Sequence, residues 1–134
     1  MIERTRVVAI IIQNHKLLLV KGSDKYKEYW TPGGKREEGE SDIEALRREL
    51  DEEINVKITS TKFFGEYTAK SPYEKDRIII SRVYVVTISG DIKVAKEIQN
   101  HVWMTKKDFE EEKYPLITTT RQRIIPDIIK AGYF

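Results

Sequence analysis

Residues 34–56 limit what this chain can fold into more than any other part, because they run from a glycine turn into a highly charged helix. Glu49, Glu52 and Glu53 stand at spacings i, i+3 and i+4, which makes their side chains neighbours on one helix surface. Carboxylates so placed destabilise a helix by roughly a few tenths of a kcal/mol per pair. A hard divalent cation such as Mg²⁺ prefers oxygen ligands and would offset this repulsion. The spacing therefore predicts a metal site on this helix.

The same helix has a clear beginning, an apolar stripe and a clear end. Ser41 and Glu44 form a capping box, which predicts that the helix begins near Ser41. An apolar stripe follows at helical spacing, formed by Ile43, Leu46, Leu50 and Ile54. At about 100° per residue, the three glutamates point about 100° away from this stripe, to the edge of the buried face. Asn55 suits a left-handed residue after the helix.

The composition is typical of one globular domain over residues 1–134, with 40% hydrophobic and 34% charged residues. The absence of cysteine excludes disulfides and thiolate metal sites and fits a reducing compartment. The apolar run at 7–12 is too short for a signal sequence or a membrane span. We therefore expect a cytoplasmic protein without a membrane partner.

Charge is unevenly distributed along the chain. Nine acidic and four basic side chains lie within residues 34–56, although the whole chain carries a net charge of +2. A negative pocket on a mildly basic body suits a site that holds cations and, through them, phosphates. The remaining basic residues are dispersed, and we expect no nucleic-acid partner.

The order of predicted elements indicates an α/β (α+β) fold. Apolar and β-branched runs predict strands at residues 6–12, 16–20, 56–69, 77–88 and 101–105. The first two are expected to form a hairpin around Asn14-His15, and Pro32-Gly33-Gly34 is predicted to be a turn. A short capped helix should follow Thr105, and Pro126 should kink or split a last helix at 118–130. This order predicts a mixed sheet, with strand 77–88 central and helices on both sides.

Residues 34–56 resemble the signature of the Nudix hydrolases. The matching positions are Gly34, Glu40, Arg48, Glu49, Leu50, Glu52, Glu53 and Val56. Asn55 replaces the signature's glycine, and asparagine tolerates the left-handed conformation well. The preceding segment, residues 30–35, is similar to that of MutT-like members. The resemblance implies an α/β/α sandwich with a mixed central sheet and a loop-helix-loop motif.

The resemblance also implies a reaction: Mg²⁺-dependent hydrolysis of a nucleoside diphosphate linked to another group, by attack of metal-activated water on the diphosphate. Mn²⁺ is expected to substitute for Mg²⁺. Glu49, Glu52 and Glu53 would bind the metal. The resemblance adds the Gly33 carbonyl and Glu40 as further ligands.

Three glutamates are candidates for the catalytic base, and one arginine is a candidate for orienting a glutamate. A crowd of carboxylates raises the proton affinity of one member, so Glu52 or Glu53 is a candidate base. Glu97 lies several residues before Trp103, where MutT-like members carry a glutamate, and is a further candidate base; the alternative is an ordinary loop carboxylate. Arg48 is expected to orient a neighbouring glutamate through a charge-assisted bond.

Substrate-binding candidates lie just before and after the glycine turn. Tyr29 and Trp30 could stack on a nucleobase, as could Tyr26, or they could pack in the core. Lys35 and Arg36 are candidate phosphate contacts, with solvated side chains as the alternative reading. For His101 a structural role is preferred.

The substrate is left open among several nucleotides. Pro72 lies where family members acting on ADP-ribose often have proline, and Tyr73 lies where members acting on diadenosine polyphosphates often have tyrosine. The compact chain and the Pro-Gly-Gly-Lys segment favour a MutT-like nucleoside triphosphate pyrophosphohydrolase, oxidised nucleotides included. ADP-ribose or a sugar nucleotide is the alternative, and a diadenosine polyphosphate or a non-catalytic nucleotide-binding module is less favoured. The residues do not determine an oligomeric state, although small family members often form a homodimer.

Overall fold

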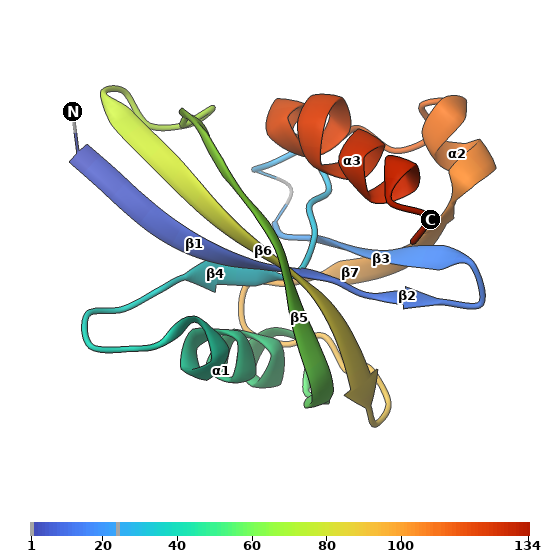
Figure 1. Ribbon diagram of the computed structural model, residues 1–134, viewed down its shortest axis with the longest axis horizontal. Helices are drawn as coiled ribbons and strands as arrows, with labels where there is room; N and C mark the ends of the chain where they lie inside the picture. Colours follow the sequence, from blue (N-terminus) through green and yellow to red (C-terminus); the bar gives the residue numbers. More distant parts are fainter. Residues whose placement is uncertain (1, 24) are drawn as a thin grey trace.

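The computed structural model describes residues 2–23 and 25–134, which form a mixed α/β fold (Figure 1). The strands are β1 (Ile2–Ile10), β2 (Ile12–Gln13), β3 (Lys16–Lys21), β4 (Gly33–Lys35), β5 (Lys57–Lys70), β6 (Arg77–Ser89) and β7 (Asn100–Thr105). The helical segments are α1 (Asp42–Ile54), α2 (Lys106–Glu110), the π-helical η1 (Thr120–Ile124) and α3 (Ile125–Lys130).

The strands divide into two sheets between helical layers. One sheet has the order β4-β1-β6-β5, with β1 and β6 parallel, and the other has the order β2-β3-β7. Helix α1 covers one side, while α2 and α3 lie on the other (Figure 1). The predicted mixed sheet, its interior strand at 77–88 and the helices on both sides are confirmed.

Strands β1 and β3 separate two hydrophobic cores because successive side chains of a strand point to opposite faces. Val7 and Ala9 of β1 join the cluster formed with α1, whereas Val8 and Ile10 join the cluster formed with η1 and α3. Residues 7–10 of β1 and 17–20 of β3 are buried on both faces, which explains why these two stretches are continuously apolar.

Helix α1 has the predicted ends. Ser41 and Glu44 form the capping box, and Asn55 adopts the left-handed conformation with φ 57° and ψ 43°. The predicted apolar stripe needs one correction, since Ile43 is only partly buried. Glu49 and Glu53 are instead buried on the same helix, so its covered face is wider and more polar than the stripe alone.

Two local predictions need correction in their extent. The long first strand does not pair with its neighbour in sequence, because β1 leaves the hairpin and pairs in parallel with β6. The predicted hairpin around Asn14 and His15 is confirmed, but it is short: it consists of β2 and β3, and the two turn residues have φ values of 50° and 62°. The predicted turn at Pro32-Gly33-Gly34 leads into strand β4, which pairs antiparallel with β1.

Helical structure continues through residues 118–130, so the segment is not split at Pro126, although its hydrogen-bond pattern is π-helical in η1 just before the proline. Pro126 lies in the first turn of α3, directly after η1. Within the described residues, no helix is both long enough and apolar enough to cross a membrane. The cytoplasmic location, the single domain over 1–134 and the homodimer stay predictions.

Asp42 connects α1 to the larger sheet. Its carboxylate accepts hydrogen bonds from Arg36 (2.6 Å), Arg82 (2.9 Å) and the Tyr84 hydroxyl (2.5 Å). Burial acts to raise the pKa of Asp42, but the bonds from Tyr84, Arg82 and Arg36 outweigh it and lower the pKa below its ordinary 3.8. The ionised carboxylate therefore stabilises the fold at neutral pH.

We expect Asp42→Asn to lower the free energy of unfolding by about 2 kcal/mol at pH 7, because hydrogen bonds to a charged group are lost. A lowered pKa contributes stability that is lost as pH falls through the folded-state value, so the difference from wild type should shrink below pH 3.8. Urea unfolding at several pH values measures this. Asp51→Asn, at an exposed position of the same helix, is the control, and equal losses from both variants would contradict the prediction.

Candidate active site

A cavity of about 710 Å³ opens where α1, β4 and the loops before β4 and β7 meet. Glu49 and Glu53 of α1 line it, together with Gly33 and Gly34 of β4 and Glu97 from the loop before β7. Two of the three crowded helix glutamates and the separate candidate base therefore reach one cavity.

Glu53 is the most deeply buried of these carboxylates, with 4% of its surface exposed. Its Oε1 accepts a hydrogen bond from the Gly33 N–H at 3.2 Å. Burial raises the pKa of Glu53 to about 8, and the negative charges of Glu49 and Glu97 add to the effect. A buried carboxylate with so little compensation is a site where a cation would bind favourably.

Glu49 is held in place from two sides and is 8% exposed. A Cβ atom at Gly34 would lie 2.5 Å from its carboxyl group, so only glycine permits this close approach. Arg48 donates to Glu49 Oε1 at 2.7 Å. The expected charge-assisted bond from Arg48 to a neighbouring glutamate is therefore present.

Arg48 connects Glu49 to the loop before the helix. Its guanidinium donates to both carboxylate oxygens of Glu40 at 2.8 Å and to the Lys35 carbonyl at 2.9 Å. The bond from Arg48 lowers the pKa of Glu40 to about 2, with help from the Glu37 N–H. Neither Arg48 nor Glu40 lines the cavity, and their geometry is that of residues that fix Glu49.

Glu52 points away from the cavity. Its carboxylate accepts a hydrogen bond from Lys96 Nζ at 2.5 Å and lies 3.7 Å from Arg48. Across residues 2–23 and 25–134, no three histidine or carboxylate side chains are grouped closely enough to ligate one metal ion. Lys96 binds one carboxylate oxygen of Glu52, and Arg48 binds one carboxylate oxygen of Glu49.

Backbone hydrogen bonds bring Glu97 to the cavity. The Lys93 and Ala95 N–H groups donate to the Ile54 and Glu53 carbonyls, each at 3.0 Å. These bonds fix the loop between β6 and β7 against the C-terminal end of α1. Only the tertiary structure could show that Glu53 and Glu97 line the same cavity, because the two residues are far apart in sequence.

The predicted substrate-binding residues separate into two groups. Trp30 and Lys35 line the cavity, and the Trp30 ring contacts Tyr26 edge-on at a centroid distance of 6.1 Å. Tyr29 packs instead against Tyr114 in the core beneath η1 and α3, at 5.2 Å. Arg36 is engaged with Asp42, as described above. His101 lies on β7, where it pairs with Val20 of β3, and its structural role stays a prediction.

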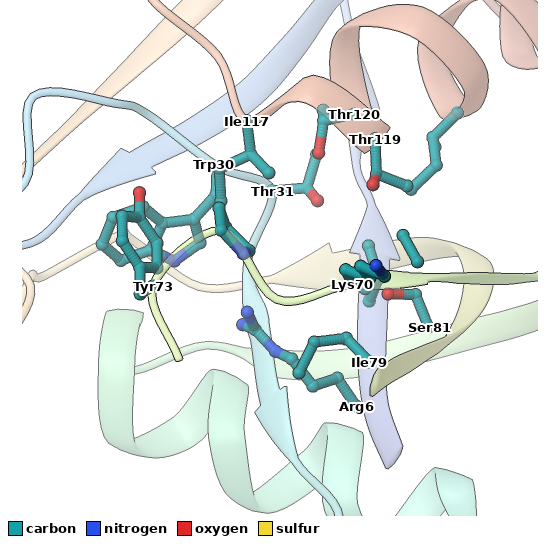
Figure 2. Close-up of a pocket in the computed structure, with 14 residues that line it drawn as sticks. Arg6, Trp30, Thr31, Lys70, Tyr73, Ile79, Ser81, Ile117, Thr119 and Thr120 are labelled. Carbon is teal, nitrogen blue, oxygen red and sulfur yellow. The ribbon is translucent and has the colours of Figure 1, made fainter. Parts of the chain in front are cut away.

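Sequence reasoning missed a second, smaller pocket of about 80 Å³ that adjoins the cavity (Figure 2). Arg6, Trp30 and Tyr73 line both spaces. The smaller pocket also exposes the buried polar residues Thr31, Ser81 and Thr120. The one sequence signal for Arg6 was a basic residue at the start of an apolar strand.

The NUDIX domain family matches residues 3–128. The chain belongs to the Nudix family. It is a hydrolase of phosphoanhydride bonds in nucleotides, and members of this family typically use a divalent metal.

Curated relatives align over nearly the whole Nudix chain. It is 29% identical over 131 residues to the 8-oxo-dGTP diphosphatase of Buchnera aphidicola subsp. Schizaphis graminum, covering 96% of this chain and 95% of that protein. It is 29% identical over 135 residues to the nucleoside triphosphatase NudI of Escherichia coli O81, covering 91% and 94%.

Solved structures share the fold. The solution structure of the E. coli ORF135 protein superposes with a TM-score of 0.78 at 28% identity, covering 98% of this chain and 94% of the other. The MutT protein from Methanosarcina mazei Go1 superposes with a TM-score of 0.83 over 98% and 96% at 19% identity, which shows the common fold alone.

Proposed function

We propose that this Nudix hydrolase converts nucleoside triphosphates, oxidised ones included, to nucleoside monophosphate and pyrophosphate. The main supporting observation is that two spaces meet. One is a cavity lined by Glu49, Glu53 and Glu97, and the other is a pocket lined by aromatic, aliphatic and hydroxyl side chains together with the basic Arg6 and Lys70. Carboxylates suit a cation that binds phosphates, whereas Trp30 and neutral hydroxyls suit a nucleobase. The activities named for the two curated relatives support the same substrate class.

Mg²⁺ fits the donor set of the cavity. Glu49 and Glu53 would hold it, with the Gly33 carbonyl, and Glu52 would join them after leaving Lys96. Bound there, Mg²⁺ would neutralise charge on the phosphate oxygens, and Mn²⁺ would do the same. The buried charge of Glu53, which costs stability without a cation, supports this assignment.

The protein's own residues then divide the remaining tasks. Glu97 is the proposed base toward the attacking water, because it reaches the cavity from a loop and remains exposed to solvent. Arg48 is a positioning residue that fixes Glu49 through the Glu40 pair. Trp30 lines the cavity and is proposed to stack on the base, and Lys35 offers a positive charge to the phosphates.

ADP-ribose or a sugar nucleotide is the second candidate. Pro72 and Tyr73 both line the smaller pocket, so the loop between β5 and β6 takes part in forming the proposed nucleoside end of the site. Substrates with a sugar beyond the diphosphate would extend from the same cavity toward solvent.

A substrate panel tests the proposal. Purified protein should release pyrophosphate from nucleoside triphosphates with Mg²⁺ or Mn²⁺, and EDTA should abolish turnover because the cation is required. Nucleoside triphosphates, 8-oxo-dGTP, ADP-ribose, sugar nucleotides and dinucleoside polyphosphates are compared by kcat/KM. Higher kcat/KM for ADP-ribose than for every triphosphate would overturn the preferred substrate, and turnover unaffected by EDTA would overturn the metal assignment.

A further inference from the structure

Arg6 stands at the junction of the two spaces that form the proposed site. Glu49 and Glu53 line only the larger cavity, and Thr31, Ser81 and Thr120 line only the smaller pocket, whereas Arg6 lines both. Figure 2 shows its guanidinium reaching toward the side of the pocket where Trp30 and Tyr73 lie. Arg6 is therefore placed between the phosphate end and the nucleoside end of a bound nucleotide.

The guanidinium of Arg6 is not engaged by the fold. Among the described residues it makes no hydrogen bond or ion pair through its side chain, while the neighbouring Arg4 donates to Glu74 at 2.9 Å. Burial lowers the pKa of Arg6, although the negative charges of Glu53 and Glu49 act in the opposite direction. A partly buried cation in this state gains from an anion that brings its own acceptor oxygens.

Strand geometry fixes where Arg6 can act. Arg6 lies on a strand that is paired on both sides: Arg6 pairs with Lys35 of β4 on one side and with Ser81 of β6 on the other. The strand interior is rigid compared with the loops, which suits a residue that positions a ligand. Lys25 and Lys35 also line the cavity, but both are exposed, and neither borders the smaller pocket.

We propose that Arg6 binds the phosphate attached directly to the nucleoside, and so sets the position of the scissile anhydride relative to the carboxylates. The inference rests on the proposed function, since it requires a nucleotide to occupy both spaces. A guanidinium can donate two parallel hydrogen bonds to one phosphate, which fixes its orientation as well as its charge. Arg6 thus becomes a substrate-binding residue outside the Nudix signature.

The test is equilibrium binding, which needs no turnover. With Mg²⁺ present, Arg6→Gln should weaken binding of the α,β-imido analogue of a nucleoside triphosphate roughly ten- to a hundredfold. Binding of the nucleoside monophosphate should weaken by the same factor, since both ligands carry the contacted phosphate. The affinity of Arg6→Gln for the free nucleoside should stay within about twofold of wild type. Arg6→Lys should recover part of the lost phosphate affinity, because lysine keeps the positive charge but cannot donate two parallel hydrogen bonds.

Two controls separate phosphate binding from structural roles. Arg47→Gln removes the same charge from an exposed position of α1 and should leave all affinities within about twofold. Mn²⁺ binding measured without nucleotide should be unchanged or tighter in Arg6→Gln, because a positive charge near Glu53 and Glu49 is removed. A variant that bound Mn²⁺ more weakly would show that Arg6 supports the metal site, which would overturn the proposal.

Two other results would overturn the proposal for Arg6. One is an affinity for the monophosphate within threefold of wild type in both Arg6→Gln and Arg6→Lys. The other is a wild-type protein that does not bind the monophosphate. Matching melting temperatures ensure that folded variants are compared. A wild-type protein that binds the analogue without hydrolysing any triphosphate would refute the proposed function and still leave the role of Arg6 measured.

Discussion

Glu53→Gln should lower kcat about a thousandfold, which corresponds to about 4 kcal/mol of transition-state stabilisation. The glutamine keeps the size of the side chain and an oxygen that can accept from the Gly33 N–H. It removes the charge that is proposed to hold Mg²⁺ beside the phosphates. Steady-state kinetics with a nucleoside triphosphate and saturating Mg²⁺ measures the loss.

Without metal, Glu53→Gln should stabilise the folded protein, although it lowers kcat. The pKa of Glu53 is raised from 4.5 to about 8, so its ionisation destabilises the folded protein as pH rises between these values. At pH 8 without metal, Glu53→Gln should therefore melt at a higher temperature than wild type. Mg²⁺ should stabilise wild type more than the variant, because it binds the ionised carboxylate.

Two further variants complete the comparison. Glu38→Gln, at an exposed position before α1, should retain wild-type kcat. Glu52→Gln should lower kcat less than Glu53→Gln does, because Glu52 is bound to Lys96 outside the cavity. If both Glu53→Gln and Glu52→Gln kept kcat within about threefold of wild type, the proposed metal site would be wrong.

Gly33→Ala should lower the free energy of unfolding by about 4 kcal/mol, a large share of the stability of an ordinary domain. A Cβ atom at this position would lie 2.0 Å from the Val7 carbonyl oxygen, and the φ of 144° is one that side chains disfavour. The obstructing atom is backbone of β1, so the pairing of β4 with β1 would have to shift. The Gly33 N–H would then move away from Glu53, and activity should fall as well.

Chemical unfolding in urea measures the loss at Gly33. Gly39→Ala is the matched control, because Gly39 also has a positive φ, of 81°, but a Cβ atom there would meet no atom within 4 Å. Gly39→Ala should lower the free energy of unfolding by only about 1 kcal/mol, from backbone strain. Equal losses at the two glycines would show that close approach to Val7 is not what requires Gly33.

Local patterns in the sequence predicted the elements better than their partners. Ser41 and Glu44 mark the start of α1, and the left-handed Asn55 follows its end, because capping depends on residues a few positions apart. The partner of β1 could not be predicted, since the parallel pairing with β6 joins residues about 75 positions apart in the register. Strand β4 resembled a turn because its glycines serve close packing rather than chain reversal.

The sequence by itself determined the family and its hydrolase chemistry, because the spacing of Arg48, Glu49, Glu52 and Glu53 is a property of one helix. Only the tertiary structure decided which of these side chains face the cavity. Lys96 binds Glu52 on the outside, a loop held to α1 brings Glu97 inside, and β1 places Arg6 between the two spaces. The physical reason is that burial and charge at a site arise from long-range contacts, whereas helical spacing is local.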